Sequence, residues 1–175
     1  MTSYCEVAIG HPIHGPYHDE EYGFPVATDD ALFERLVLEI NQAGLSWLTI
    51  LKKREAFRRA FDGFALERVA GYSDAKRGRL MHDDSIIRNR LKVDAAIENA
   101  KRIRALGSFR AWLDEHHPLA PADWIKLFRK TFVFTGGEIT TSFLLSAGYL
   151  EGAHEPSCPV YARVAASQPA WMRQG

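Results

Sequence analysis

Four side chains able to bind a transition metal lie in two pairs near the two ends of this 175-residue chain. Cys5 and His18 belong to the N-terminal segment, and His154 and Cys158 to the C-terminal segment. Two thiolates and two imidazoles suit tetrahedral Zn²⁺ and leave no coordination position open, which indicates a structural site. The pattern predicts a zinc ion that joins the two chain ends; a chance pairing among the seven histidines is the alternative. These two cysteines, the only ones in the chain, are expected to be reduced thiols or metal ligands rather than a disulfide.

A carboxylate within an apolar helix is the second candidate. Glu39 lies between Leu38 and Ile40, at the edge of an apolar helical face. Burial of a carboxylate is costly unless it is paired or functional, and burial raises its pKa. Gln42 and Trp47 follow at the next helix corner and add an amide and a large aromatic surface. Together these residues predict an acidic, aromatic pocket for a flat cationic or electron-poor ligand; a half-exposed glutamate beside a core tryptophan is the alternative.

A glycine-containing hairpin at residues 132–137 is the third candidate. Its sequence Phe-Val-Phe-Thr-Gly-Gly precedes a helix that we expect from Glu138 to Ala147, with Gly148 as its stop. Backbone amides and the positive end of the helix dipole make such a place suitable for a phosphate. An ordinary tight turn explains the same two glycines.

The elements that must position these residues are predicted to be helices. Apolar residues recur with helical spacing through most of the chain and almost never alternate, which predicts an all-α fold. Residues 1–27 are rich in His, Pro, Gly and Tyr and are expected to form an irregular arm of turns. We therefore expect one domain, residues 1–175, of seven or eight helices, with a C-terminal tail over residues 149–175. The expected helices span residues 29–43, 46–61, 66–72, a stretch from 73, and then 92–106, 109–116, 124–130 and 138–147.

The helix over residues 46–61 is expected to be amphipathic. Its inward face is predicted to carry Leu48, Leu51, Phe57 and Phe61, and its outward face Lys52, Lys53, Arg54, Arg58 and Arg59.

Composition and charge exclude several classes of protein. With 46% hydrophobic and 25% charged residues, the chain is neither disordered nor of low complexity. Lys and Arg balance Asp and Glu at 22 each, but residues 1–39 hold eight acidic residues and one basic, whereas residues 76–104 hold nine basic and four acidic. Such asymmetry indicates either a face that binds a polyanion or a solvated helix surface. Neither a membrane span nor a secretory signal is visible, so a cytoplasmic protein is expected.

Taken in order along the chain, these features resemble the 3-methyladenine DNA glycosylase I family, small helix-hairpin-helix base-excision enzymes with a bound zinc. The resemblance extends over nearly the whole chain and is carried by residues 17–23, 38–47, 50–54, 86–92 and 132–148, and by the two metal-ligand pairs. Its most specific part is the block Leu-Glu-Ile-Asn-Gln-Ala-Gly-Leu-Ser-Trp at residues 38–47, followed by Lys-Lys-Arg at residues 52–54.

The resemblance assigns roles to individual residues. It implies that Glu39 is the catalytic residue and hydrogen-bonds a flipped alkylated base, that Trp47 stacks on this base, and that Tyr17 contacts it. The hairpin residues that it places against the DNA backbone are Thr135, Gly136 and Gly137, aided by the basic face of residues 76–104. It implies a structural Zn²⁺ bound by Cys5, His18, His154 and Cys158.

The implied activity is hydrolysis of the N-glycosidic bond of 3-methyladenine in double-stranded DNA by a monomer, with water as the nucleophile and no covalent lysine intermediate. The chain departs from the family at Val7, His14 and Tyr22, where other aromatic residues are usual, and at Glu138, whose charge opposes phosphate binding. A glycosylase for a different damaged base, a DNA-binding module that has lost catalysis, and a protein of this fold that acts without DNA are therefore alternatives.

Overall fold

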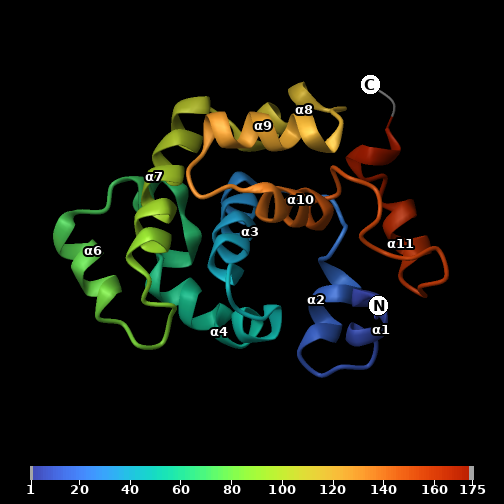
Figure 1. Cartoon of the computed structure of the whole chain (residues 1–175), viewed down its shortest axis with the longest axis horizontal. Coiled ribbons are helices and arrows are strands. Elements are labelled where there is room, and N and C mark those ends of the chain that lie inside the picture. The colour runs from blue at the N-terminus through green and yellow to red at the C-terminus, as the bar shows by residue number, and fades with distance from the viewer. Residues whose placement is uncertain (1, 174–175) are drawn as a thin grey trace.

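The computed structural model describes residues 2–173, and helices are the only regular secondary structure within that range (Figure 1). The all-α prediction is therefore confirmed. Two short 3₁₀ turns, η1 (Asp62–Phe64) and η2 (Ala170–Met172), accompany the α-helices. The α-helices are α1 (Tyr4–Ala8), α2 (His14–Glu20), α3 (Asp29–Gln42), α4 (Trp47–Ala60), α5 (Leu66–Ala70), α6 (Asp74–Met81), α7 (Arg90–Leu106), α8 (Phe109–His116), α9 (Pro121–Thr131), α10 (Gly137–Ser146) and α11 (Tyr161–Ala166).

The eight helices that periodicity predicts are all present, and in most of them a local capping signal agrees with the apolar pattern. Five of them follow a Ser, Thr or Asn whose side chain accepts a hydrogen bond from the backbone amide three residues further on. These caps are Thr28 for α3, Ser46 for α4, Ser73 for α6, Asn89 for α7 and Ser108 for α8. Helix α9 begins three residues earlier than predicted, with Pro121 in the first turn, where a missing amide costs nothing.

The N-terminal arm was predicted wrongly. Residues 1–27 contain two short helices instead of turns alone, because Ser3 and Glu6 form a reciprocal capping box that starts α1. Helix α2 includes Gly15 and Pro16, but both lie in its first turn, where proline is tolerated. The prediction of seven or eight helices is also wrong, since α1 and α2 in the arm and α11 in the predicted C-terminal tail bring the described residues to eleven α-helices.

Helix α3 lies at the centre of the molecule and contacts α4, α5, α7, α8 and α10 (Figure 1). Its predicted apolar stripe is buried, from Leu32 and Phe33 to Ile40. Helices α8 and α9 cross the top of the view in Figure 1, above α10, and their aromatic rings fill the core beneath them. Helix α8 is attached to the start of α3, where the backbone amide of Arg110 donates to the carboxylate of Asp29 at 2.8 Å, whereas the other end of α3 carries the candidate carboxylate and shares a pocket with Ser142 of α10.

The N-terminal helices α1 and α2 and the C-terminal helix α11 are grouped on the right of Figure 1. A second, smaller apolar cluster joins them and consists of Cys5, Cys158, Val160 and Val164. No helix within residues 2–173 is long and apolar enough to cross a membrane.

The orientation of α4 differs from the prediction in part. Phe57 and Phe61 are buried as predicted, but Leu48 and Leu51 are only half-buried. Arg54 was expected to face solvent, and its side chain is only 12% exposed. The reason is that the side chain of Arg54 meets carboxylates of both the N-terminal arm and α3, so this face of α4 is an interface.

Candidate functional site

The corner between α3 and α4 presents the predicted pocket residues. Gly44 turns the chain with a φ of +80°, a left-handed conformation that suits glycine, and the amide of Leu45 donates to the carbonyl of Gln42 at 2.7 Å. Ser46 then caps α4, so that Trp47 is its first residue. The corner thus places Gln42 at the end of one helix and Trp47 at the start of the next.

A pocket of about 130 Å³ lies at this corner. The structure brings the three predicted base-contacting residues together there, Tyr17 from α2, Glu39 from α3 and Trp47 from α4. The ring centres of Tyr17 and Trp47 are 5.2 Å apart, with their planes inclined by 57°. The full lining is Tyr4, Tyr17, Tyr22, Glu39, Gln42, Trp47 and Ser142.

The Glu39 side chain is buried within the pocket wall, and this residue is only 5% exposed. Its carboxyl group forms neither a hydrogen bond nor an ion pair with any residue in the described range 2–173. Burial raises its pKa to about 8, against a smaller opposing effect of the Arg35 charge. A cation in the pocket would stabilise the ionised carboxylate, because opposite charges in a poorly solvated site attract strongly.

Tyr17 offers a hydrogen-bond donor to the same pocket. Its hydroxyl is buried and has no partner among the described residues. Burial raises the pKa of Tyr17 to about 12, so the phenol keeps its proton at neutral pH. The guanidinium groups of Arg35 and Arg54 lie 5.3 and 5.7 Å from the centre of its ring and favour its position. A buried donor without a partner is costly, and a bound ligand would satisfy it.

Two aromatic walls of the pocket, Tyr4 and Tyr22, are not among the predicted base-contacting residues. Tyr4 comes from α1, and its hydroxyl forms a 3.0 Å hydrogen bond with Nδ1 of the buried His14. Tyr22 lies beside it, with ring centres 5.2 Å apart. The capping box at Ser3 and Glu6 is the sequence signal that predicts α1, and with it the presentation of Tyr4 next to Cys5.

The four predicted metal ligands meet in one buried cluster. The ligand atoms of Cys5, His18, His154 and Cys158 all lie within 4.8 Å of one another. Sγ of Cys158 is 3.7 Å from Nε2 of His18 and 3.6 Å from Nδ1 of His154, and Sγ of Cys5 is 3.8 Å from the same Nδ1. A tetrahedral zinc with ordinary bond lengths separates sulfur from nitrogen by about 3.6 Å. The donor set and its spacing therefore fit Zn²⁺.

Both imidazoles are held in the orientation that a metal requires. Nδ1 of His18 donates to the carboxylate of Asp19 at 2.7 Å, which leaves Nε2 as the free lone pair facing Cys158. Nε2 of His154 donates to the carbonyl of Tyr22 at 2.6 Å, which leaves Nδ1 facing both cysteines. Carboxylate and carbonyl partners of this kind orient histidine ligands in metal sites.

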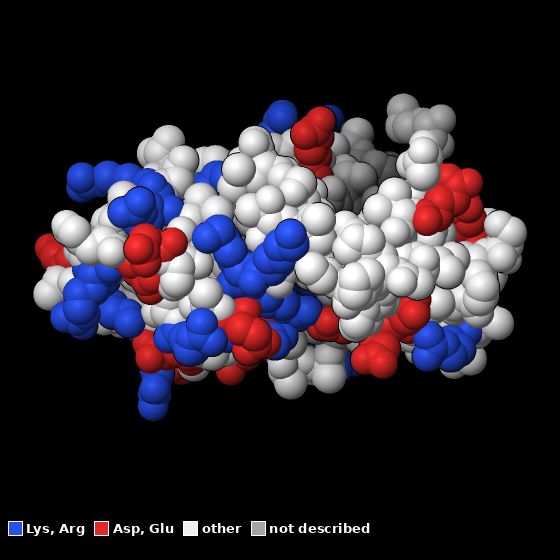
Figure 2. Space-filling model, turned by 90° about the horizontal axis from the view of Figure 1, so that it is seen from below, with Lys and Arg blue, Asp and Glu red and all other residues white. Residues whose placement is uncertain are grey.

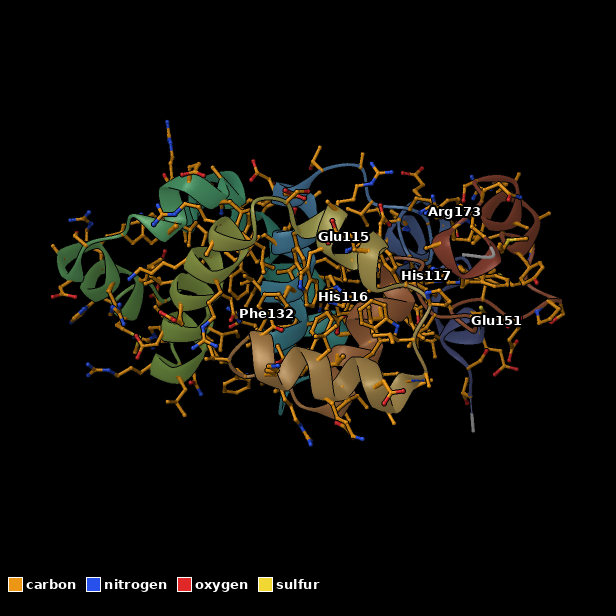
Figure 3. All side chains as sticks on the ribbon, turned by 90° about the horizontal axis from the view of Figure 1, so that it is seen from above. Glu115, His116, His117, Phe132, Glu151 and Arg173 are labelled. Atoms are coloured by element: carbon orange, nitrogen blue, oxygen red, sulfur yellow. The ribbon has the colours of Figure 1, made fainter. Side chains whose placement is uncertain are left out.

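The remaining histidines of the C-terminal half lie elsewhere. Figure 3 shows His116 and His117 beside Glu115 near the end of α8, on the upper side of the molecule. Nδ1 of His116 hydrogen-bonds the carbonyl of Trp112 at 2.7 Å, as a side chain at the end of a helix does. Among the described residues, the Cys5 cluster is the only group of three or more His, Cys, Asp or Glu side chains spaced for one metal ion.

A larger groove of about 880 Å³ adjoins the pocket and shares Glu39, Gln42 and Ser142 with it. The predicted hairpin glycines, Gly136 and Gly137, line this groove where α10 begins. The amides of the first turn of α10 have no acceptor within the helix, as at every helix start. An extended anionic ligand in the groove would therefore meet free backbone donors.

The absence of side chains at these glycines leaves the groove open. A Cβ atom added to Gly136 would meet nothing within 4 Å, and one added to Gly137 would make an ordinary 3.5 Å contact with Ile125. The φ of Gly136 is −69°, which any residue can adopt. Thr135, by contrast, is buried, and its hydroxyl donates to the carbonyl of Phe128 at 3.0 Å, so its side chain holds the hairpin together.

Basic side chains gather on part of the lower face. Figure 2 shows Lys and Arg over the left and centre of this face, where Figure 1 places α4, α6 and α7, with Asp and Glu among them. Several are paired within the chain, including Arg77 with Asp94 and Arg102 with Glu98. The basic segment predicted from the sequence is therefore partly neutralised.

Comparison with known proteins identifies similar sequences. The sequence pattern of a family described as methyladenine glycosylase matches residues 8–123. The DNA-3-methyladenine glycosylase of Haemophilus influenzae is 40% identical over 106 residues, which are 61% of this chain and 57% of that protein. DNA-3-methyladenine glycosylase 1 of Escherichia coli K12 is 46% identical over 90 residues, which are 51% of this chain and 48% of that protein. The matched segments thus span about half the length of these two relatives.

Solved structures match over more of the chain. That of 3-methyladenine DNA glycosylase I from Staphylococcus aureus superposes with a TM-score of 0.78 at 34% identity, over 91% of this chain and 97% of that one. A crystal structure of 3-methyladenine DNA glycosylase I gives a TM-score of 0.77 at 32% identity, over 85% of this chain and 94% of that one. Both likenesses extend beyond the segment that the family pattern matches.

Proposed function

The chain belongs to the methyladenine glycosylase family, and from this premise we propose that it excises 3-methyladenine from double-stranded DNA as a monomeric hydrolase. One observation carries the proposal furthest. The buried carboxyl of Glu39 and the hydroxyl of Tyr17, neither of which has a partner among the described residues, face one pocket beside the indole of Trp47. This is the arrangement that selects a flat cation, with an aromatic surface to stack on and a carboxylate to balance the charge.

The substrate chemistry agrees with such a pocket. Methylation at N3 makes the adenine ring cationic, which weakens the bond between N9 and C1′ of the sugar. When this bond breaks, its electron pair moves to the base, which leaves as neutral 3-methyladenine, and positive charge develops at C1′. Water then adds to C1′ and loses a proton, so that an abasic sugar remains. No covalent bond to the protein is needed.

The pocket residues act on this reaction by selection and positioning. Ionised Glu39 stabilises the cationic base in its extrahelical position and accepts a hydrogen bond from it, Tyr17 donates one, and Trp47 replaces the stacking that the base loses on leaving the duplex. Extrusion costs least for a damaged base, which adds to the selectivity.

The groove residues would hold the DNA backbone. Gly136 and Gly137 permit close approach of the phosphates to the free amides at the start of α10, and Thr135 keeps the hairpin in shape. The helices α9 and α10 with this connection are proposed to be the helix-hairpin-helix element of the fold.

The cluster of Cys5, His18, His154 and Cys158 is proposed to bind a structural Zn²⁺. Four protein ligands complete its coordination, so the metal would contribute stability at the chain ends and no chemistry at the substrate. The neighbouring Asp19 carboxylate and Tyr22 carbonyl would hold the two imidazoles in place.

A base-release assay tests the proposed function. Duplex DNA treated with a methylating agent is incubated with the protein, and free bases are separated by chromatography. We expect release of 3-methyladenine by the wild type and a loss of about 100-fold or more for Glu39→Gln, with no change for Glu67→Gln, whose side chain is 79% exposed. Failure of the wild type to release any alkylated base would overturn the proposal. Tight binding to abasic or methylated duplex without release would instead indicate a DNA-binding module.

A further inference from the structure

Lys92 is a buried cation that the proposed chemistry does not use. The residue is only 5% exposed, although it lies in the first turn of α7. Its ammonium donates to the carbonyl of Asn41 at 2.8 Å and to the carbonyl of Ala43 at 2.6 Å. Burial lowers its pKa, and no carboxylate lies within ion-pair distance of it in the described range. Its partners are therefore backbone dipoles.

These two carbonyls belong to the end of α3, where a cation is favourable. The last carbonyls of a helix lack intrahelical donors and carry the negative end of the helix dipole. The cap residue Ala43 has a φ of −52° and a ψ of 119°, so the chain leaves the helix without the left-handed turn that often satisfies these groups. Lys92 supplies the missing donors from a different helix.

The segment held in this way is the wall of the candidate site. The carbonyls of Asn41 and Ala43 lie on either side of Gln42, which lines both the pocket and the groove. Gly44 and Leu45, which follow, form the lip of the groove, and Leu45 remains 41% exposed. A shift of this backbone would move Gln42 and the start of α4, where Trp47 lies.

We propose that Lys92 is a positioning residue of the base pocket: its ammonium donates hydrogen bonds to the backbone on both sides of Gln42 and thereby fixes the positions of Gln42 and Trp47. Lys92 reaches no substrate itself and acts through this corner alone. The inference rests on the proposed function for its effect on catalysis, but the stabilisation of the α3–α4 corner by Lys92 can be measured independently of that function.

The central test is Lys92→Met, which removes the ammonium and retains an unbranched side chain. Hydrogen exchange should show faster exchange of the amides of Ala43 and Leu45, which donate to the carbonyls of Ile40 and Gln42. Exchange in the body of α7 and in α8 should remain as in the wild type. The affinity for free 3-methyladenine, measured by calorimetry, and kcat on methylated duplex should both fall by about 10- to 100-fold, as for other small displacements in a site.

The matched control is Lys101→Met, the same change at an exposed position of the same helix. It should leave the exchange of Ala43 and Leu45 and the affinity for the free base unchanged. Lys92→Gln keeps an uncharged side-chain amide that can donate and should recover part of the lost affinity; it also serves if Lys92→Met fails to fold.

The outcomes separate the two proposals. Wild-type exchange at Ala43 and Leu45 in both Lys92 variants would overturn the positioning role, and so would unchanged affinity for the base together with unchanged kcat. A wild-type protein that neither binds nor releases 3-methyladenine would defeat the proposed function, while the exchange experiment would still decide whether Lys92 holds the corner.

Discussion

The guanidinium of Arg54 binds the carboxylate of Glu21 through two parallel hydrogen bonds of 2.7 Å, which join α4 to the end of α2. Its Nε donates to Glu34 of α3 at 2.9 Å, so one side chain connects three helices. The same guanidinium lies over the ring of Tyr17. The ion pair therefore fixes the N-terminal arm, and with it one wall of the pocket, against the helical core.

Arg54→Met should loosen this attachment. We expect the free energy of unfolding to fall by about 1–3 kcal/mol, because the half-buried carboxylates of Glu21 and Glu34 lose the guanidinium that both of them bind. Affinity for 3-methyladenine should fall as well, since Tyr17 loses one of its two cationic neighbours. Urea unfolding and calorimetry measure the two effects. Arg58→Met is the control: its side chain is 37% exposed, and the change should cost at most about 1 kcal/mol. Equal losses in the two variants would contradict the special role of Arg54.

The ion pair between Arg54 and Glu21 also predicts a loss of stability in acid. Burial alone would raise the pKa of Glu21, but hydrogen bonds to Arg54 and the charges of Arg54 and Arg35 hold it below its usual value of 4.5. This stabilisation is present above the unfolded pKa and is lost as the pH falls through the folded pKa. The stability difference between wild type and Arg54→Met should therefore shrink below about pH 4.5.

Glu39→Gln should stabilise the protein at alkaline pH while it weakens function. The folded pKa of about 8 lies above the usual 4.5, so the folded state keeps a proton that the unfolded chain releases. The free energy of unfolding of the wild type should therefore fall as the pH rises from about 4.5 to about 8. The Glu39→Gln variant lacks this dependence. The difference in free energy of unfolding between this variant and the wild type should therefore shift in favour of the variant by a few kcal/mol between about pH 5 and about pH 9. Unfolding curves at both values test this, with Glu67→Gln as the exposed control; parallel pH profiles for wild type and Glu39→Gln would exclude the raised pKa.

Removal of the proposed zinc should loosen the two chain ends and spare the core. Protein purified without chelator should contain about one zinc per chain by X-ray fluorescence. After extraction of the metal, brief proteolysis should cut within α1, α2 and α11, because their small apolar cluster buries little surface, while α3 and α7 to α10 persist as a resistant core. Cys158→Ser should give the same pattern without a chelator. Purified protein free of metal, with uncut ends, would rule out the structural zinc.

Five of the eight predicted helices carry two agreeing signals, an apolar stripe and a capping side chain, and this made them predictable. In α3, the spacing of Leu32, Phe33, Leu36 and Ile40 marks the buried face, and Thr28 caps the start. Helix α1 has only five residues, too few for a periodic pattern, so only its capping box indicates it. Periodicity therefore predicts only turns in the arm.

A site residue is predictable where its chemical type is unusual for its sequence surroundings. It is not predictable where only tertiary contacts bring it into the site. Glu39 is conspicuous as a carboxylate in an apolar helix, and four metal-capable side chains stand out by their type. Nothing in the sequence around Tyr4 indicates that it lines the pocket, and nothing around Lys92 indicates that it donates hydrogen bonds to the end of α3. Periodicity places Arg54 on the polar face of α4 and so predicts that it is exposed, whereas carboxylates from α3 and from the end of α2 meet it there.

Gly136→Ala should separate binding from stability at the hairpin. The added Cβ meets no atom within 4 Å and the backbone angle is ordinary, so the fold should tolerate it and gain up to about 1 kcal/mol from the less flexible unfolded chain. Affinity for duplex DNA should fall several-fold, because the methyl group occupies the groove where phosphates approach the amides. Fluorescence anisotropy with a labelled duplex measures this. Gly71→Ala, remote from the groove, should leave DNA affinity unchanged; undiminished affinity in Gly136→Ala would argue against backbone contact at this glycine.

Glu138→Gln should raise DNA affinity while it slightly lowers stability. Glu138 lies in the first turn of α10 and lines the groove beside the two glycines. Its charge is favourable at the positive end of the helix, and the loss of this interaction should cost about 0.3–1 kcal/mol of unfolding free energy. The same charge repels phosphate, so its removal should strengthen duplex binding several-fold at about 50 mM salt and by less at about 200 mM, where screening weakens the repulsion. Anisotropy titrations at the two salt concentrations test this, with Glu67→Gln as a control that removes an exposed charge from α5. Equal affinities of Glu138→Gln and wild type at the lower salt would mean that phosphates do not pass the start of α10.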